Sequence, residues 1–448
     1  MTTHQFFPDY CSGTEQLTLS VARELLRRGH EVAVYTGYPS TTHLSEGERF
    51  DSYQFNGIPV HRFHHTYQLM DGQRSKIALS FDNKLAKDRF RVIMEEFRPD
   101  IVHFFHLNRL GSGLIDAAVD MRSPAFYTPT DFWAICHTAQ LHLPSGAFCP
   151  GPTLHAGNCA KHLAESHAYS PFRFVAKVTP IIAFEQVTRM ASRVEMLGFS
   201  GLSEFGAIER RLRINRDRMN RLSGIVSPNA FMTETLMRYG IRKELLHELA
   251  YGIDDPFEDA SPACQESSQR LRIGFIGTLA QHKGCHVLID AFKLAFQQDQ
   301  AVLKIYGREG DFPVYCDRLR LLVGGRTDIE FCGTFQNSEI GNIFNCLDVL
   351  VVPSVWFENT PLVIYSAMAA KCPVIASDIP GITACIRHDS TGLVFKSGDH
   401  KSLAAQLIRF LNDGELRLRL INNSRKPSSV SDYVDGLIGL WGFGAAPH

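Results

Sequence analysis

Hydrophobic residues form short runs without polar alternation in the stretch from Asp348 to Asp378. The runs Val349–Val352 and Pro373–Ala376 flank a helical segment that Pro361 opens. Unbroken apolar runs are typical of strands buried on both faces of a parallel sheet, and proline is favoured in the first turn of a helix. The pattern therefore predicts a buried strand–helix–strand unit.

One carboxylate, Glu358, follows the first of these strands and precedes the helix. Ligands of parallel α/β sheets bind at the carboxyl ends of the strands, where helix N-termini also attract anions. Glu358 is therefore a candidate ligand-binding residue.

The N-terminal half repeats this order of elements. Leu17, Val21 and Leu25 recur at helical spacing. Ser12 and Glu15 fit a capping box, in which Ser12 caps the helix and Glu15 reaches back to it. Strands are predicted at Glu31–Tyr35, Ile101–Phe105 and Ala125–Thr128. Strands that alternate with helices indicate a doubly wound parallel sheet.

The start of the chain departs from this scheme, because a glycine loop that leads into a capped helix should follow a central strand. Only MTTHQFF precedes the loop, so the first strand is expected to be clipped. A start codon annotated too late and a real truncation both explain this. We favour the former, since Thr3–Phe7 resembles the tail of a longer strand.

A second series of elements begins after the polar segment 255–270, which contains proline and serine and is predicted to be a linker. Its strands are expected at Arg272–Ile276, Val302–Tyr306 and Ile329–Cys332, with later helices at Leu403–Leu411 and near Ser431–Trp441. The predicted domains are residues 1–254 and 271–426, followed by a C-terminal helix in 427–448.

The loop Gly277–Gly284 joins the first of these strands to a helix. A glycine loop in this position places backbone amides and a helix dipole toward an anion, and Lys283 adds a positive charge. The loop is a candidate phosphate site, although the pattern is weak on its own.

Composition limits the class of protein. A chain of 448 residues exceeds one ordinary core, which favours two domains. The net charge of −1 argues against nucleic-acid binding by bulk charge. No apolar run reaches the roughly 18 residues that span a bilayer, so a cytoplasmic protein is expected. Its eleven cysteines are predicted to be mostly reduced thiols.

An arginine cluster lies in the helical segment between about 160 and 222. It could bind an acceptor phosphate or an anionic membrane at the inner face. We favour a solvated helix face with Glu209 and Asp217 as partners. Its members are Arg210, Arg211, Arg213, Arg216, Arg218 and Arg221.

Three cysteines and a histidine have spacing compatible with a metal. Cys136, Cys149, Cys159 and His162 form C-x12-C-x9-C-x2-H. Three thiolates and an imidazole suit tetrahedral zinc. The alternatives are a structural zinc clip and four unrelated residues in a long loop.

Several separated segments together resemble the retaining GT-B glycosyltransferases of family 4, from Phe6 to about residue 412. They are GTEQLTLSVARELLRRGHEVAVYT, DIVHFFHL, SPNAFMTETLMRYGI with YGID, LRIGFIGTLAQHKGCHVLIDAF, and PSVWFENTPLVIYSAMAAKCPVIASDIPG. The resemblance implies two Rossmann-like domains across a cleft, with the last helix crossing back onto the N-terminal domain. It also implies a nucleotide-diphosphate sugar donor on the C-terminal domain and a glycan, lipid-linked or small-molecule acceptor on the other.

The resemblance assigns donor-side roles. Lys283, with amides from Gly277 to Gly284, would hold the diphosphate, and Thr278 stands where the family usually has a basic residue. Glu358 would bind hydroxyls of the transferred hexose. Asn359, Thr360, Pro361 and Leu362 match the turn that approaches sugar and phosphates. Ser366 replaces the glutamate that clamps the ribose, which predicts donor binding roughly tenfold to a hundredfold weaker.

On the acceptor side, the resemblance matches Gly13 to the glycine loop and Thr130 to a position that is often histidine. Asp131 becomes the more probable polar contact, and His103 and His106 divide evenly between cleft and core. Catalysis would rest on Glu358, Asp131 and Lys283 without an enzyme nucleophile or a required cofactor, because the leaving phosphate can accept the acceptor's proton.

Two classes of function remain open at this point. One is a glycosyltransferase, which fits the KG loop and the ENTPLV turn better than an epimerase or phosphorylase does. The other is a degenerate, non-catalytic nucleotide-sugar binder, which the clipped strand, Thr278 and Ser366 favour. Neither class indicates an obligate protein partner.

Overall fold

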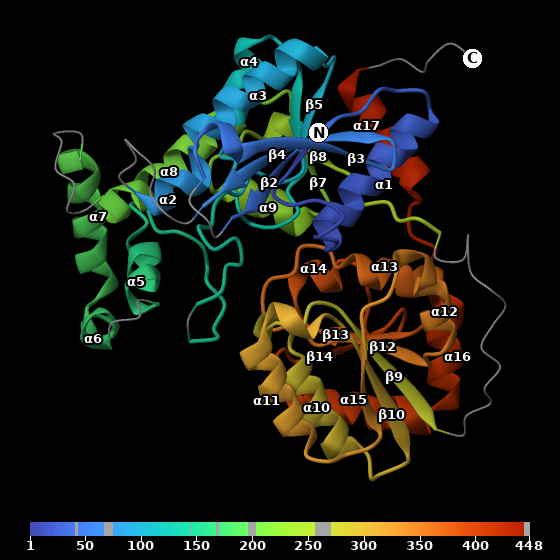
Figure 1. Cartoon of the computed structure of the whole chain (residues 1–448). Helices are drawn as coiled ribbons and strands as arrows, with labels where there is room; N and C mark the ends of the chain where they lie inside the picture. Colours follow the sequence, from blue (N-terminus) through green and yellow to red (C-terminus); the bar gives the residue numbers. More distant parts are fainter. Residues whose placement is uncertain are drawn as a thin grey trace. The chain divides into compact units, whose positions relative to one another are not determined.

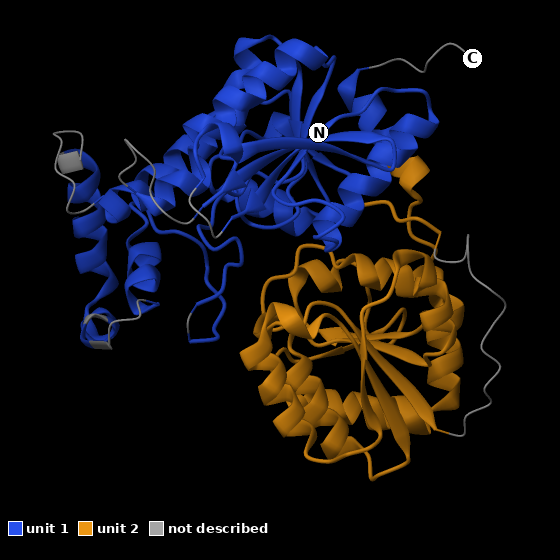
Figure 2. Cartoon of the chain, viewed as in Figure 1, with its two compact units in different colours: residues 1–250, 434–448 blue, residues 251–433 orange. Residues whose placement is uncertain are grey.

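The computed structural model describes residues 1–40, 44–66, 75–143, 145–166, 170–195, 203–255 and 270–442. The chain forms two compact units, residues 1–250 with 434–448 and residues 251–433 (Figure 2). Each unit is built on its own sheet. Most of the predicted linker 255–270 lies outside the described residues.

The first unit contains an eight-stranded sheet in the order β3-β4-β2-β1-β5-β6-β7-β8 (Figure 1). All neighbouring strands are parallel except the antiparallel pair β3 and β4. The strands are β1 (Thr2–Thr3), β2 (Val34–Pro39), β3 (Phe50–Phe55), β4 (Ile58–His65), β5 (Val102–Phe104), β6 (Ala125–Tyr127), β7 (Gly224–Ser227) and β8 (Leu246–Glu248). The predicted parallel α/β sheet is confirmed.

Helices of this unit connect the strands, and those between 157 and 219 confirm the helical segment predicted there. The helices are α1 (Gly13–Arg27), α2 (Lys76–Phe81), α3 (Lys84–Phe97), α4 (Gly113–Asp120), α5 (Gly157–Glu165), α6 (Ser170–Val178), α7 (Ile181–Glu195), α8 (Ser203–Met219) and α9 (Ala230–Arg238). The last helix, α17 (Val430–Trp441), belongs to this unit from residue 434 onward.

The hairpin of β3 and β4 was not predicted. Its two-residue loop is Asn56-Gly57, and both residues have positive φ, at 52° and 77°. Asn-Gly between two strands is a strong hairpin signal, because the type I′ turn needs positive φ at both positions. The dipeptide was therefore a signal that could have identified this hairpin.

The central strand β1 contains only Thr2 and Thr3, which pair with Tyr35 and Thr36 of β2. Thr2 also pairs with Phe104 of β5. The expectation of a short first strand is confirmed, but its assignment to Thr3–Phe7 is wrong. The strand predicted at Glu31–Tyr35 begins at Val34 instead, because residues 31–33 have little of β1 beside them to complete a ladder.

The capping box of α1 is only half formed. Ser12 stands at the N-cap, but its side chain makes no capping hydrogen bond. The carboxyl of Glu15 does accept from the backbone N–H of Ser12. Glu15 is 1% exposed, which a helix cap alone does not require.

The arginine cluster of α8 is not a purely solvated face. Arg211 is 2% exposed and donates to the backbone oxygen of Trp133. Arg218 pairs with Asp116 at 2.7 Å, and Arg216 pairs with its predicted partner Asp217 at 2.9 Å. These bonds fix α8 on the unit and leave less of the cluster for an anionic surface.

The second unit contains a wholly parallel six-stranded sheet in the order β11-β10-β9-β12-β13-β14. Its strands are β9 (Leu271–Ile276), β10 (Ala301–Tyr306), β11 (Ile329–Gly333), β12 (Val349–Val352), β13 (Val374–Ser377) and β14 (Leu393–Phe395). Val349 and Val351 enter one apolar cluster, whereas Leu350 and Val352 enter another. Both faces of β12 are thus buried, as its unbroken apolar run predicted.

The helices of the second unit are α10 (Cys285–Ala295), α11 (Pro313–Val323), α12 (Ile340–Asn345), α13 (Leu362–Ala369), α14 (Pro380–Thr383), α15 (His400–Asn412) and α16 (Gly414–Asn423). The predicted Leu403–Leu411 helix is confirmed as the central part of α15. Among the helices that the structure describes, none is long and apolar enough to cross a membrane.

Candidate functional site

Glu358 lies between the end of β12 and the start of α13, and it is 5% exposed. Its Oε1 accepts three hydrogen bonds, from Lys283 Nζ, Ser354 Oγ and Trp356 Nε1, each at 2.7 Å. These donors fix the carboxylate in one orientation. Because all three bonds end on Oε1, Oε2 is the oxygen that can turn toward a ligand.

The three donors also control the charge of Glu358. Burial on its own would raise the pKa of this carboxyl. The charge of Lys283 and the bonds from Lys283, Ser354 and Trp356 outweigh burial, and the pKa falls below its ordinary value. Glu358 is therefore an ionised, preorganised acceptor.

Trp356 connects the two loops of the site. Its ring lies 4.6 Å from that of His282, and Lys283 Nζ lies 5.0 Å from its centroid. The backbone N–H of Val355 donates to the His282 oxygen at 2.9 Å. The sequence analysis did not identify Trp356 or Ser354, although both lie within four residues of Glu358.

Two glycines allow backbone segments to meet here. A Cβ on Gly284, whose φ is +74°, would stand 1.9 Å from the Pro353 oxygen. A Cβ on Gly381 would stand 2.0 Å from the Glu358 oxygen. Larger residues at either position would displace the loop that carries Glu358.

The loop Gly277–Gly284 joins β9 to α10, as predicted. However, several of its amides already have partners: Gly277 donates to Tyr306, Ala280 to Thr278, Lys283 to Ala280, and Gly284 to Gln281. A phosphate would therefore rely on the Lys283 side chain and the remaining amides of this loop, or on a rearrangement of the turn. Thr278 is partly buried within it.

The turn after Glu358 is held by its own side chains. Asn359 Nδ2 donates to the hydroxyl of Tyr251 at 3.0 Å, and Thr360 Oγ1 donates to the Asn359 oxygen at 2.8 Å. Pro361 precedes Leu362, the first residue of α13. Ser366 Oγ donates to the Leu362 oxygen at 3.3 Å, so this hydroxyl is turned along its own helix.

In the first unit, His106 and Asp131 come together. His106 Nε2 lies 2.8 Å from Asp131 Oδ2, and the backbone N–H of Asn108 donates to His106 Nδ1 at 3.1 Å. The N–H of Trp133 donates to Asp131 Oδ1 at 2.7 Å. Because Asn108 occupies Nδ1, the ring proton lies on Nε2 and points to the carboxylate.

Two further residues that the sequence analysis did not place in a site join this pair. The ring of His4 lies 4.1 Å from that of His106, and its Nε2 lies 3.7 Å from Glu15 Oε1. Burial raises the pKa of Glu15 to about 7 despite two backbone donors and the charge of His106. Burial also lowers the pKa of His4. Glu15 Oε2 and His4 Nδ1 are buried without a hydrogen-bond partner.

The other acceptor-side predictions have different outcomes. His103 bonds through Nε2 to Thr128 at 2.8 Å and accepts through Nδ1 from Trp441 at 3.2 Å, which uses both ring nitrogens. His103 is therefore a core residue, and the open choice between cleft and core is resolved. Thr130 Oγ1 donates weakly to the Phe105 oxygen at 3.4 Å, and Gly13 is the first residue of α1.

The predicted zinc ligands are not assembled as a metal site. Within the ranges given above, no group of three or more histidine, cysteine or acidic side chains is placed to hold a metal ion. Cys136 Sγ lies 3.2 Å from Thr138 Oγ1, and His162 packs edge to face on His137. Burial raises the pKa of Cys149 and Cys159, which opposes thiolate formation. The geometry gives the zinc prediction no support, and it stays a prediction.

The two parallel-sheet units and the ionised carboxylate at the end of a central strand define the class. The fold is that of the GT-B glycosyltransferases. HepE from Anabaena, solved with UDP and glucose, has a TM-score of 0.62 at 17% identity, with 98% of this chain and 97% of HepE covered. WaaG, a glycosyltransferase involved in lipopolysaccharide biosynthesis, has a TM-score of 0.57 at 15% identity, with 99% of both chains covered.

The family follows from the sequence models. Residues 12–252 match the glycosyl transferase 4-like domain, and residues 257–427 match glycosyl transferases group 1. The chain therefore belongs to the group 1 glycosyltransferases with a 4-like N-terminal domain.

Curated relatives match over shorter segments. An uncharacterised glycosyltransferase of Methanocaldococcus jannaschii is 32% identical over 152 residues, which are 34% of this chain and 38% of that protein. The alpha-D-kanosaminyltransferase of Streptomyces kanamyceticus is 28% identical over 219 residues, which are 44% of this chain and 54% of that protein. The chain thus spans between 38% and 54% of the length of these two relatives.

Proposed function

We propose that the protein is a retaining glycosyltransferase that moves a hexose from a nucleotide-diphosphate sugar to a glycan, lipid-linked or small-molecule acceptor. The observation that carries the proposal is the ionised Glu358 carboxylate, held by three donors at the carboxyl end of β12. Membership of the group 1 family and the nucleotide and sugar in the HepE structure support the donor class.

In this proposal Glu358 binds hydroxyls of the transferred sugar through Oε2. A fixed carboxylate loses no orientation energy when the sugar arrives, so the binding energy goes into positioning. Lys283, which neutralises Glu358 in the absence of donor, lies within reach of a diphosphate at the Gly277–Gly284 loop. There it would stabilise the charge that develops on the leaving group.

No side chain of the donor site is required as a nucleophile in this scheme. The departing phosphate oxygen accepts the acceptor's proton on the face that the leaving group vacates, which gives retention. Asp131, oriented by Trp133 and His106, would bind the acceptor hydroxyl.

The test pairs Glu358→Gln with Glu330→Gln, an exposed glutamate of β11 in the same unit. Purified wild type is incubated with UDP-, GDP- and TDP-hexoses, and release of the nucleoside diphosphate is followed. We expect slow hydrolysis with at least one donor, a loss of about a hundredfold or more in Glu358→Gln, and no change in Glu330→Gln. Proton NMR of the released sugar reports whether the anomeric configuration is retained.

The second candidate is a nucleotide-sugar binder without catalysis. The observation that favours it is Ser366, whose hydroxyl is turned to the Leu362 oxygen where the family resemblance implies a ribose-binding carboxylate. The same nucleotide-sugars, titrated in a thermal-shift assay, separate the two functions. A donor that raises the melting temperature while wild type and Glu358→Gln are equally inert supports the binder.

A further inference from the structure

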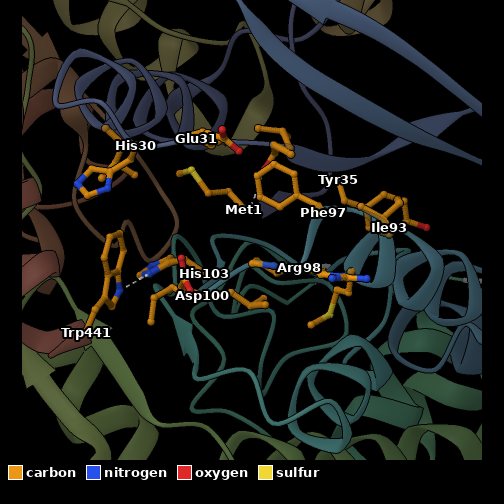
Figure 3. A pocket seen from close by; sticks show the side chains of 18 of the residues that line it. Met1, His30, Glu31, Tyr35, Ile93, Phe97, Arg98, Asp100, His103 and Trp441 are labelled. Atoms are coloured by element: carbon orange, nitrogen blue, oxygen red, sulfur yellow. Dashed lines mark hydrogen bonds between the residues drawn. The ribbon is translucent and has the colours of Figure 1, made fainter. Parts of the chain in front are cut away.

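The first unit contains a cavity of about 370 Å³ beside its shortest strand. Its wall combines the backbone of residues 30–34 and 98–102 with apolar side chains from α1, α3 and α17. Figure 3 shows Met1, Tyr35, Phe97 and Trp441 around this space. No role in the proposed transfer uses any of these side chains.

The cavity continues the line of β1. Thr2 is paired with Tyr35 of β2 on one side and with Phe104 of β5 on the other. Preceding residues of both neighbours, 31–33 and 101, lie outside any strand and line the cavity. The two neighbouring strands are thus separated by one strand position, which β1 fills only as far as Met1.

Hydrogen bonding at Met1 already follows a parallel ladder. The Met1 nitrogen donates to the Ala33 oxygen at 2.7 Å, and the Tyr35 N–H donates to the Met1 oxygen at 2.9 Å. A peptide N–H makes the same bond to Ala33 without a charge to bury. The amine is a poorer fit, because burial lowers its pKa to about 5.

We propose that this cavity is a strand-acceptor site, which takes an extended apolar peptide segment that ends at the Met1 nitrogen and continues β1 between β2 and β5. Four residues, at about 3.3 Å each, match the length of wall from His30 to Ala33. Apolar, β-branched side chains suit a position that is buried on both faces of a parallel sheet.

Occupation of the site stabilises the part of the unit that β1 leads into. His4 directly follows β1 and contacts His106, so a longer β1 also restrains the start of the His4, Glu15, His106 and Asp131 cluster. The inference does not depend on glycosyl transfer, because stability and amide exchange report on it without a substrate.

The experiment adds four residues directly before Met1. One variant carries Val-Ile-Val-Val and its control carries Gly-Ser-Asn-Ser. For the apolar extension we expect a melting temperature about 5 °C or more above the control. We also expect amide exchange of residues 31–33 and 101 to slow by about tenfold or more. Equal melting temperatures and equal exchange in the two variants overturn the proposal.

A second arm supplies the segment as a free tetrapeptide, which also covers the case that the extended chain fails to fold. Acetyl-Val-Ile-Val-Val added to the unextended chain should slow exchange of residues 31–33, at higher concentration because a separate peptide loses its translational freedom. The Val-Ile-Val-Val variant should not respond. Equal binding of the peptide to both proteins places it elsewhere and contradicts the inference, as does the absence of any protection.

Discussion

Glu358 and Glu15 are two buried carboxylates near the beginning of a helix, and their environments have opposite effects. Glu358, 5% exposed, receives three donors on one oxygen, and its pKa is lowered. Glu15, 1% exposed, has one oxygen without a partner, and burial raises its pKa to about 7. Burial alone therefore does not decide the charge of a carboxyl. The number and charge of its donors do.

Removal of Lys283 should have the largest effect on this contrast. In Lys283→Met, Glu358 keeps two neutral donors but loses its counter-charge, so its pKa should rise as that of Glu15 does. We expect transferase or hydrolase activity to fall by about a hundredfold or more, and unfolding free energy to fall by about 2 kcal/mol, since the lysine is partly exposed. Urea unfolding and donor turnover measure the two effects.

The matched control is Lys401→Met, an exposed lysine at the beginning of α15 in the same unit. It should change neither quantity appreciably. Full activity in Lys283→Met would show that the donor site lies elsewhere, whatever the stability.

Glu15→Gln tests the other half of the comparison. The folded chain holds a proton on Glu15 up to a pKa of about 7, whereas the unfolded carboxyl titrates near 4.5. The folded state thus binds more protons between these values, and this residue's contribution to stability falls as pH rises through that window. At pH 8 the glutamine variant should be more stable by on the order of 3 kcal/mol, and near pH 4.5 the difference should vanish.

Thermal unfolding of wild type and Glu15→Gln from pH 5 to 8 measures that difference, with the exposed Glu95→Gln of α3 as the control. The difference between variant and wild type is the informative quantity, because the buried Met1 amine contributes in the opposite direction. Its pKa of about 5 in the folded chain, against 8.0 ordinarily, makes stability rise over pH 5 to 8. A difference that does not vary with pH would mean that Glu15 is ionised throughout.

The sequence was most informative where strands are buried on both faces. The apolar run Val349–Val352 predicted β12 with its observed bounds, and Glu358 followed from its place after that run. The start of β2 could not be predicted in the same way, because residues 31–33 are strand-like in sequence and lack a neighbour for their ladder.

Long-range contacts explain what the sequence could not supply. The pattern of Ser12 and Glu15 indicates a helix cap, yet the environment of Glu15 is set by His4 and His106, which other segments bring to it. His103 and His106 looked equivalent in sequence. They differ because β5 ends at Phe104, so His103 faces Trp441 of α17 whereas His106 meets Asp131.

Ser366→Glu adds a third carboxylate to the comparison. The hydroxyl of Ser366 now bonds to its own helix, so a longer side chain on α13 is needed to reach a ribose. Hydrogen bonds to a charged acceptor contribute about 1.5–3 kcal/mol, which predicts donor binding tighter by roughly tenfold to a hundredfold. Calorimetric titration with the nucleotide-sugar measures this, and Ser366→Gln separates the effect of length from that of charge. Unchanged or weaker affinity in Ser366→Glu counts against a missing ribose clamp.

Trp356→Phe should have the smallest effect, and it addresses the three-donor rule most directly. The substitution removes the Nε1–H bond to Glu358 Oε1 and keeps an aromatic ring near Lys283. With two donors left, the pKa of Glu358 should rise slightly, so activity should be lost at a higher pH on the acid side. We expect KM for the donor to rise by about fivefold, with kcat changed less, because one of three bonds to the carboxylate is lost. Trp441→Phe is the control, since its indole donates to His103 in the other unit. An unchanged acid limb together with an unchanged KM would mean that Lys283 and Ser354 alone determine the ionisation of Glu358, and that the contrast with Glu15 depends on one charge rather than on the number of donors.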